Sequence, residues 1–361
     1  MTSIRARYMV RLLLTLGLIS VLVSPTGAAA ASPKPPTVII TGDILLAGRI
    51  GSFIEKKGPA APFAHVRSII ASADLAIGNL ECPLATIGRP ADKEYAFRAH
   101  PAAAAALVDA GFDIMTLANN HSVDYGPEAL LETLTTLRKA KLTTVGAGED
   151  LARARRWVVV ERGSPPVKIA VLAFSNMFPK EFYARKQRAG TNPAYLAFVK
   201  EDIAAARKRA DVVIAIFHWG DELSDTPSWK QRVLAAAAAE AGADLVVGHH
   251  SHVLQGMEVR GRTLIIYSLG NFLFPSRRAA THQTVILRYH PNRNGQARVE
   301  IIPCEIKDFQ PQPITGLRQR AACLTRLADL SESLGARVPD KDGVILLPAR
   351  PASVDKPLHS P

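Results

Sequence analysis

Short apolar runs that alternate with helix-like segments limit this chain to a narrow range of folds. Runs such as Thr37–Ile40, Val212–Phe217 and Leu245–Val247 have the length and composition of buried strands, and the helical patterns Pro101–Ala110 and Pro127–Ala140 open with proline. Repeated strand–helix alternation indicates an α/β fold with mostly parallel sheets. The chain has 361 residues, of which 48% are hydrophobic and 21% charged, so it can bury a substantial core.

Six of the apolar runs end in polar residues that could bind an ion or a substrate. The carboxyl ends of parallel strands meet at one edge of a sheet, where sites commonly form. We therefore expect these side chains to converge: Asp43, Glu81, Asn120 with His121, His218, His250 with His252, and Asn271. The alternative for a single carboxylate is a cap on the next helix. For an isolated His-x-His it is a polar loop after a buried strand.

The run Gly248–His252 contains three histidines in four positions. His250 and His252 are two residues apart, so in an extended backbone both side chains leave on the same side. Neighbouring imidazoles suit zinc, manganese or iron. Combined with two carboxylates and an amide, they provide donors for two ions that share a bridging carboxylate. The expected cofactor is one or two divalent metal ions, either Mn, Fe, Zn or Mg.

The order and local sequence of the polar segments resemble those of the CapA-type proteins, the poly-γ-glutamate capsule family within the calcineurin-like metallophosphoesterase superfamily. The matching segments lie between Thr37 and Phe274: Gly42-Asp43, Asn79 to Leu84, Ala118 to His121 with Asp124 to Gly126, His218 to Gly220 with Glu222, Gly248 to His252, and Tyr267 to Phe272. The resemblance implies a four-layer α/β/β/α sandwich built from two mixed sheets.

The resemblance also implies roles for individual residues. Asp43 and His252 would bind the first metal, Glu81 would bridge, and Asn120, His218 and His250 would complete the second metal. His121 would act as general acid on the leaving group. The sequence departs from the superfamily pattern at two positions: Leu45 stands where a second ligand follows the aspartate, and the bridging residue is a glutamate.

Further residues are expected in or near the site, and three of them have an alternative role. Ser268 and Asn271 would line the site. Asp124 would orient His121 or cap the helix that Pro127 opens. Arg98 would contact an anionic substrate or form a surface salt bridge, and Glu222 would orient a ligand or face solvent.

Two functions remain open. The first is a hydrolase in which a metal-activated water is the nucleophile and His121 the general acid, acting on a phosphoester or a γ-glutamyl amide of an anionic envelope polymer such as poly-γ-glutamate. The second is a non-catalytic, metal-stabilised polymer-binding component of a capsule synthesis or export assembly with membrane-bound partners. The formal net charge of +12 is scattered along the chain, which indicates either solubility or attraction to anionic polymers, and no nucleic-acid-binding signature accompanies it.

The sequence divides into a signal peptide (1–31), a CapA-type metallophosphatase-like domain (32–310), and a C-terminal helix with a Pro-rich tail (311–361). Arg5, Arg7 and Arg11 precede the apolar run Leu12–Val23, and small residues follow it, which is the pattern of a secretory signal. This predicts export to the periplasm or the extracellular space. An uncleaved membrane anchor is the alternative.

The three cysteines Cys82, Cys304 and Cys323 have no metal-binding spacing. An exported protein could form one disulfide, for which Cys304 and Cys323 are the nearest partners in sequence. Buried free thiols are the alternative.

Overall fold

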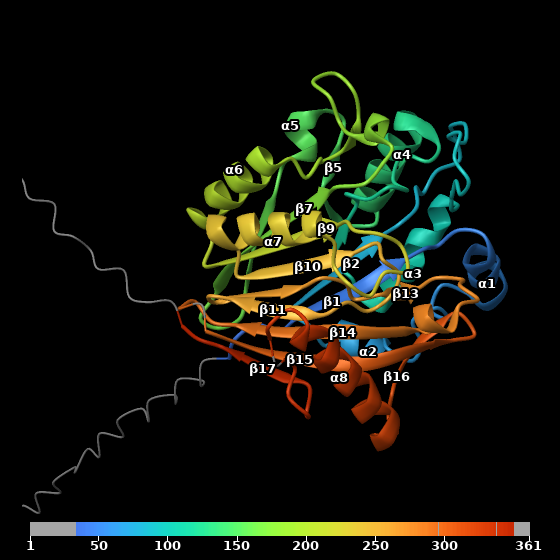
Figure 1. The fold of residues 1–361 in the computed structure, drawn as a ribbon. Coiled ribbons are helices and arrows are strands. Elements are labelled where there is room, and N and C mark those ends of the chain that lie inside the picture. Colours follow the sequence, from blue (N-terminus) through green and yellow to red (C-terminus); the bar gives the residue numbers. More distant parts are fainter. Residues whose placement is uncertain (1–33, 295, 337, 350–361) are drawn as a thin grey trace, which may run out of the picture. The chain divides into compact units, whose positions relative to one another are not determined.

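The computed structural model describes residues 34–294, 296–336 and 338–349. In this part of the chain two mixed sheets lie face to face, and helices cover their outer faces (Figure 1). The predicted four-layer α/β/β/α sandwich is therefore confirmed. The predicted signal peptide (1–31) lies outside the described residues. Within them, no helix combines the length and apolar character needed to cross a membrane.

The first sheet has nine strands and runs from β16 to β4. Its order is β16 (Gln310–Pro313), β15 (Ala297–Lys307), β14 (Gln283–Pro291), β1 (Val38–Ile44), β2 (Leu75–Leu80), β3 (Ile114–Thr116) and β4 (Thr143–Val145), with β13 (Asn271–Leu273) beside β1 and β17 (Val344–Leu347) beside β15. Strands β1 to β4 are parallel, whereas β14, β15, β16 and β17 pair antiparallel with their neighbours.

The second sheet has six strands. Its order is β11 (Met257–Arg260), β12 (Thr263–Ile266), β10 (Leu245–His249), β9 (Val212–His218), β7 (Val167–Ser175) and β6 (Val158–Arg162). The four central strands are parallel and the two edge strands are antiparallel. A small third sheet joins β5 (Ala147–Gly148) to β8 (Gly190–Thr191).

The described residues form three hydrophobic cores, and successive side chains of one strand belong to different cores. In β1, Val38 and Ile40 face the core between the two sheets, whereas Ile39 faces the core under the outer helices. Alternation of this kind follows from the two-residue repeat of a strand. Because both faces of the central strands are covered, these strands consist of continuous apolar runs, which the sequence shows directly.

The helices cover the outer faces of both sheets. On the nine-stranded sheet lie α1 (Arg49–Lys57), α2 (Arg67–Ala71), α3 (Ala104–Ala110) and α4 (Gly126–Lys139), and on the six-stranded sheet lie α6 (Leu196–Arg207) and α7 (Trp229–Ala241). The short α5 (Leu151–Ala154) contacts β5 and β8, and three 3-10 turns span Pro101–Ala103, Lys180–Phe182 and Ala279–His282.

The C-terminal segment packs onto the same sandwich. The predicted C-terminal helix is α8 (Leu317–Glu332), and its Leu324 and Leu327 belong to the core between the sheets. No helix or strand was predicted in the proline-rich tail, yet Val344–Leu347 forms β17 and pairs with β15. The apolar tetrapeptide at 344–347 was the available signal for this strand.

The three cysteines are buried free thiols, so no Cys304–Cys323 disulfide forms and the alternative interpretation is the right one. Burial raises the pKa of Cys304 to about 12 and that of Cys323 to about 11. Both side chains therefore serve as small apolar groups in the cores.

Gly248 allows β10 to pack closely against its neighbours. A Cβ atom at this position would overlap the carbonyl oxygen of Tyr267 and the indole nitrogen of Trp219, which are hydrogen-bonded to each other at 3.0 Å. We expect Gly248→Ala to lower the free energy of unfolding by about 3 kcal/mol, because backbone must move. Urea unfolding measures this. The matched control Gly51→Ala, in α1, should change it by less than about 1 kcal/mol; equal effects of the two substitutions would contradict the packing argument.

Candidate metal centre

The predicted strand-end residues come from both sheets and meet at their carboxyl ends. Asp43 lies in β1, Glu81 directly after β2, Asn120 in the turn after β3, His218 at the end of β9, and His250 and His252 in the turn after β10. Asn120 is half-buried and the other five are buried. The nine-stranded sheet thus supplies the carboxylates and the amide, and the six-stranded sheet supplies the imidazoles.

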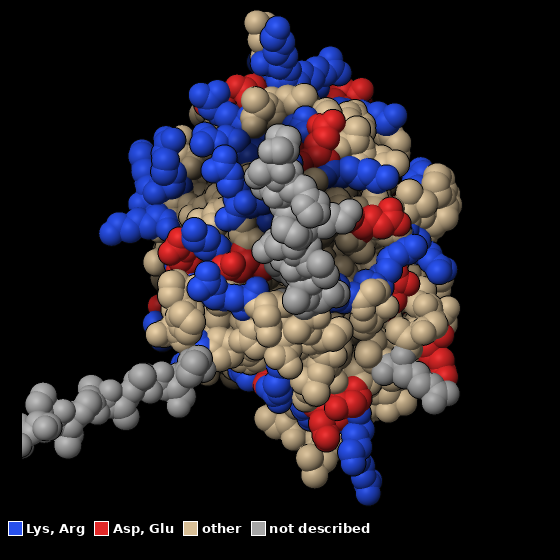
Figure 2. All heavy atoms as spheres, turned by 90° about the vertical axis from the view of Figure 1, so that its left-hand side faces the viewer, with Lys and Arg blue, Asp and Glu red and all other residues tan. Residues whose placement is uncertain are grey.

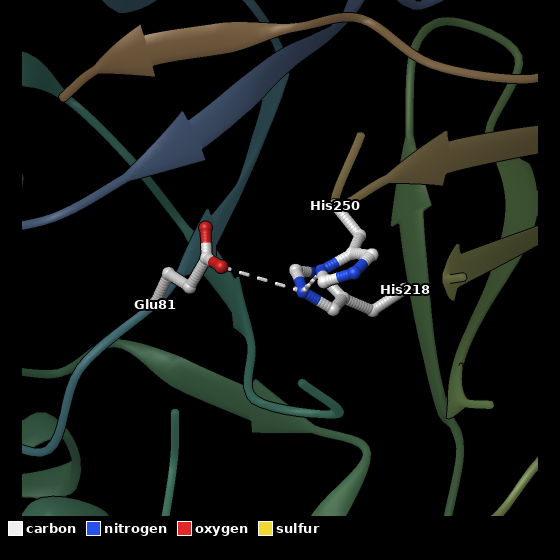
Figure 3. Close-up of side chains that lie close together, drawn as sticks. All are labelled: Glu81, His218 and His250. Carbon is white, nitrogen blue, oxygen red and sulfur yellow. Dashed lines mark hydrogen bonds and ion pairs between the residues drawn. The ribbon is translucent and has the colours of Figure 1, made fainter. Parts of the chain in front are cut away.

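Potential ligand atoms lie close enough to share an ion. One group consists of Glu81, His218 and His250, and a second of Asp43, Glu81 and His252; within each group the ligand atoms lie within 4.8 Å of one another. Figure 3 shows Glu81 pointing toward His218, with His250 beside it. The Oε1 atom of Glu81 lies 3.4 Å from Nε2 of His218, and Oδ2 of Asp43 lies 3.5 Å from Nδ1 of His252. Glu81 belongs to both groups, which is the position of a bridging ligand.

Unsatisfied polar atoms show that a cation fits this cluster. Both carboxylate oxygens of Glu81 are buried and accept no hydrogen bond from the described residues. Nε2 of His218 can carry one proton at most, yet it lies 2.8 Å from Oδ1 of Asn120 and 3.1 Å from Nδ1 of His250, besides its contact with Glu81. Buried polar atoms without a hydrogen-bond partner lower the stability of a folded protein, and a bound cation would give these atoms a partner. The mixed oxygen and nitrogen donors are compatible with Mn, Fe, Zn or Mg.

The donors of the cluster differ in their electrostatics: burial lowers the pKa of His252, but the charges of Glu81 and Asp43 outweigh this effect and raise it to about 9. Burial and the charge of Asp43 raise the pKa of Glu81 well above its ordinary value. Burial lowers the pKa of His218, and burial together with His252 lowers that of His250 to about 3, so both imidazoles are neutral near pH 7. Neutral imidazoles are the form that binds metals. Burial opposes ionisation of Asp43, but its hydrogen bond with His252 and the surrounding histidines hold its pKa below the ordinary value.

The turn after β10 has a strained backbone at both candidate ligands. His250 has a φ of 93° and His252 a φ of 59°, a region that side chains other than glycine seldom adopt. The backbone N–H of His250 donates to Oδ2 of Asp43 at 3.1 Å, which helps to hold the turn. His249 points away from the cluster, and its Nε2 lies 2.9 Å from the carbonyl oxygen of Thr41. Strain of this kind is typical of functional sites.

His121 lies at the edge of the cluster and is held by Asp124. Its Nδ1 donates to Oδ2 of Asp124 at 2.7 Å, which leaves Nε2 directed toward Glu81, 3.9 Å from Oε1. Of the two interpretations of Asp124, orientation of His121 is the one the structure shows, because α4 has no side-chain cap. Burial lowers the pKa of His121, and the hydrogen bond with Asp124 opposes this effect.

A cavity of about 450 Å³ leads from solvent to the cluster. His121, His252 and Asn271 lie at its inner end, and Phe97 and Phe274 are among the aromatic residues in its wall. A molecule in this cavity would therefore contact both His252, one of the candidate metal ligands, and His121.

The other predicted residues divide between the cluster and the periphery. Asn271 accepts a hydrogen bond from Nδ1 of His252 at 2.8 Å. Ser268 accepts one from the backbone N–H of Gly270 and shapes the turn before Asn271 without reaching the cluster. Arg98 is exposed, and its guanidinium contacts the Ile87 carbonyl and lies over the Tyr125 ring, 4.2 Å from the centroid. These contacts include no ion pair with a carboxylate among the described residues, and the predicted contact of Arg98 with an anionic substrate stays a prediction.

Several residues that support the site had no assigned role in the sequence interpretation. Asn79 donates to Oδ1 of Asp43 at 2.8 Å, and Asn119 donates to Oδ1 of Asn79 at 3.2 Å. Lys93 donates to Oδ1 of Asp124 at 2.7 Å and to the Asn120 carbonyl at 2.8 Å. The two asparagines belong to the recognised segments, so their position was a usable signal. No pattern in the sequence singles out Lys93.

Comparison with known proteins identifies similar chains. Residues 37–276 match the family model described as "Bacterial capsule synthesis protein PGA_cap". The chain is 36% identical over 275 residues to the PGA biosynthesis protein CapA of Bacillus subtilis, covering 76% of this chain and 72% of the relative. It is 32% identical over 287 residues to the capsule biosynthesis protein CapA of Bacillus anthracis, covering 77% and 69%. Among solved structures, NAD nucleotidase of Haemophilus influenzae aligns with a TM-score of 0.47 at 14% identity, covering 81% of this chain and 63% of that chain. The range matched by the family model contains every residue of the cluster.

Proposed function

This chain belongs to the bacterial capsule synthesis family PGA_cap, and from that premise we propose that it is an exported, metal-dependent hydrolase acting on an anionic envelope polymer such as poly-γ-glutamate. The family predicted from the motifs is confirmed. The polymer is proposed because the Bacillus subtilis relative is named for PGA biosynthesis and the Bacillus anthracis relative for capsule biosynthesis.

The observation that supports the hydrolase proposal is the pairing of Glu81, whose buried oxygens have no hydrogen-bond donor among the described residues, with His121, whose Nε2 lies 3.9 Å from Glu81 and whose side chain lines the cavity. Asp43, Glu81 and His252 would hold one ion, and Glu81, Asn120, His218 and His250 the other. Bound there, divalent ions would lower the pKa of a water molecule and polarise the phosphoryl or carbonyl group under attack.

His121 would act on the leaving group. Its Nδ1–H stays on Asp124, so a proton on Nε2 is the one available to the cavity. Lys93 neutralises the other oxygen of Asp124 and fixes that carboxylate in place. In this arrangement the protonated imidazole donates from Nε2 to the departing oxygen or nitrogen, and Asp124 stabilises the charged form before the transfer.

Basic surface away from the cluster favours a second candidate function, the binding of polymer without turnover as part of a synthesis or export assembly. A hollow of about 680 Å³ between α4 and β6 has Arg138, Lys141, Arg153 and Arg156 in its wall, together with one acidic residue, Glu149, which pairs with Arg153. Figure 2 shows one face of the molecule, and Lys and Arg side chains gather on its upper part. Clustered positive charge attracts anionic chains at low salt.

A comparison of metal-loaded and metal-free protein tests the proposal. We expect protein loaded with Mn²⁺ to shorten poly-γ-glutamate or to cleave a phosphoester, and protein treated with EDTA to lose that activity until Mn²⁺ is restored. Chain length by gel filtration and phosphate release are the measurements. Absence of turnover with all four candidate ions, together with retained polymer binding, would favour the second function.

Export is the remaining part of the proposal. It is supported by the pattern of arginines, apolar run and small residues within residues 1–31. Fractionation of cells that produce the full chain, followed by N-terminal sequencing, distinguishes a cleaved signal from a retained anchor.

A further inference from the structure

We propose that Glu222 is a ligand of the metal centre. It would bind the ion held by Asp43, Glu81 and His252, from the solvent side. The inference rests on the proposed metal-dependent function, because it needs an ion to be present. A carboxylate oxygen of Glu222 and ring nitrogens of His250 and His252 all lie within 4.8 Å of one another. His252 also belongs to the group with Asp43 and Glu81, so Glu222 extends a site that already has three donors.

The loop that carries Glu222 is fixed to the histidine turn. The backbone N–H of Leu223 donates to the carbonyl oxygen of Ser251 at 2.8 Å, between the two histidines. Leu223 has a φ of 63°, a conformation that a leucine adopts only when the surrounding structure imposes it. The side chain of Gln255 donates to the Ser224 carbonyl at 2.9 Å on the other side. The position of Glu222 relative to the histidines is therefore set by the backbone.

The surroundings of Glu222 point to a cation. Glu222 is exposed at the mouth of the cavity, and among the described residues no Lys or Arg forms an ion pair with it. Two buried imidazoles lie on its inner side, and the unpartnered oxygens of Glu81 point into the same centre. An ion between the carboxylate of Glu222 and these two ring nitrogens would satisfy both kinds of donor.

A third carboxylate changes the ion that the centre prefers. With Asp43, Glu81 and Glu222, the site offers three anionic oxygen donors besides the imidazoles. Carboxylates suit manganese and magnesium, whereas nitrogen-rich sites suit zinc. The inferred ligand thus favours an oxygen-preferring ion such as Mn²⁺.

Mn²⁺ titration of the full chain tests the role of Glu222. We expect Glu222→Gln to weaken binding of Mn²⁺ at least about tenfold, because loss of a ligand costs no less than loss of a ligand's hydrogen-bond partner. Isothermal titration calorimetry on protein stripped with EDTA gives the affinity and the number of ions. The matched control is Asp225→Asn, which removes an exposed carboxylate of the same loop, outside the metal-binding groups of the described residues. Its affinity should equal that of the wild type.

Substitution by cysteine tests direct contact independently of affinity. The native thiols are buried, so wild-type protein loaded with Co²⁺ should show no thiolate-to-cobalt charge-transfer absorption. Glu222→Cys should show this band in the near ultraviolet, and Asp225→Cys should not.

The outcomes separate this inference from the proposed function. Equal Mn²⁺ affinity of the wild type and Glu222→Gln, with no charge-transfer band in Glu222→Cys, overturns the role of Glu222 alone. A wild-type chain that binds none of the candidate divalent ions overturns both.

Discussion

A Glu81→Gln protein is expected to bind Mn²⁺ more than about a hundredfold more weakly than the wild type. Glu81 belongs to two of the groups of donors, and both of its buried oxygens lack a hydrogen-bond partner among the described residues. Glutamine has nearly the same shape but only one acceptor atom and no charge, so it cannot bridge two cations. Calorimetric titration and elemental analysis after dialysis measure the loss.

Without metal, the same substitution is expected to raise the midpoint of thermal unfolding. Burial and Asp43 raise the pKa of Glu81, so the folded state binds a proton that the unfolded state releases above pH 4.5. The contribution of Glu81 to stability therefore falls as the pH rises above 4.5, and glutamine removes this dependence. In EDTA, the difference between the unfolding midpoints of Glu81→Gln and the wild type should grow from pH 5 to pH 8. The surface control Glu55→Gln should change neither property; unchanged Mn²⁺ affinity in Glu81→Gln would refute the bridging role.

The second large effect is expected at His121. His121→Ala should reduce turnover by about 10²- to 10⁴-fold, the range for loss of a general acid, while the metal content stays close to that of the wild type. The separation is expected because Nδ1 of His121 donates to Asp124, and His121 belongs to none of the groups of donors that could hold an ion among the described residues. Steady-state kinetics and elemental analysis on one preparation measure both quantities.

Two variants control for the His121 result. His65→Ala removes an exposed histidine and should have wild-type activity. Asp124→Asn keeps the imidazole but removes the carboxylate that stabilises its charged form, so its activity should fall between those of the wild type and His121→Ala. If His121→Ala loses its metal together with its activity, His121 is a ligand or a structural residue, and the assignment as acid is wrong.

The sequence predicted the positions of the cluster residues because they are attached to buried parallel strands. The apolar runs before Asp43, His218 and His250 can only be central strands, and the carboxyl ends of such strands share an edge. Their proximity follows from the topology of the sheets. The chemical role of each residue stays a prediction, to be decided by the substitutions described above.

Residues on loops could not be predicted in the same way. Lys93 and Glu222 reach the site through segments whose course depends on tertiary contacts, such as the hydrogen bond from Leu223 to Ser251. Arg98 is a further example: its guanidinium contacts the carbonyl of Ile87, an anchor that the sequence does not reveal, and its contact with an anionic substrate stays a prediction. A loop residue can be placed only once its anchors are known.

The division of donors between the two sheets has a consequence for biogenesis. Oxygen donors at Asp43, Glu81 and Asn120 precede nitrogen donors at His218, His250 and His252 by about a hundred positions along the chain. A nascent polypeptide that has built only strands β1 to β4 would hold no complete coordination sphere. Capture of an ion then has to wait until β9 and β10 have formed and packed against these strands, so an occupied centre would report that the two sheets have met.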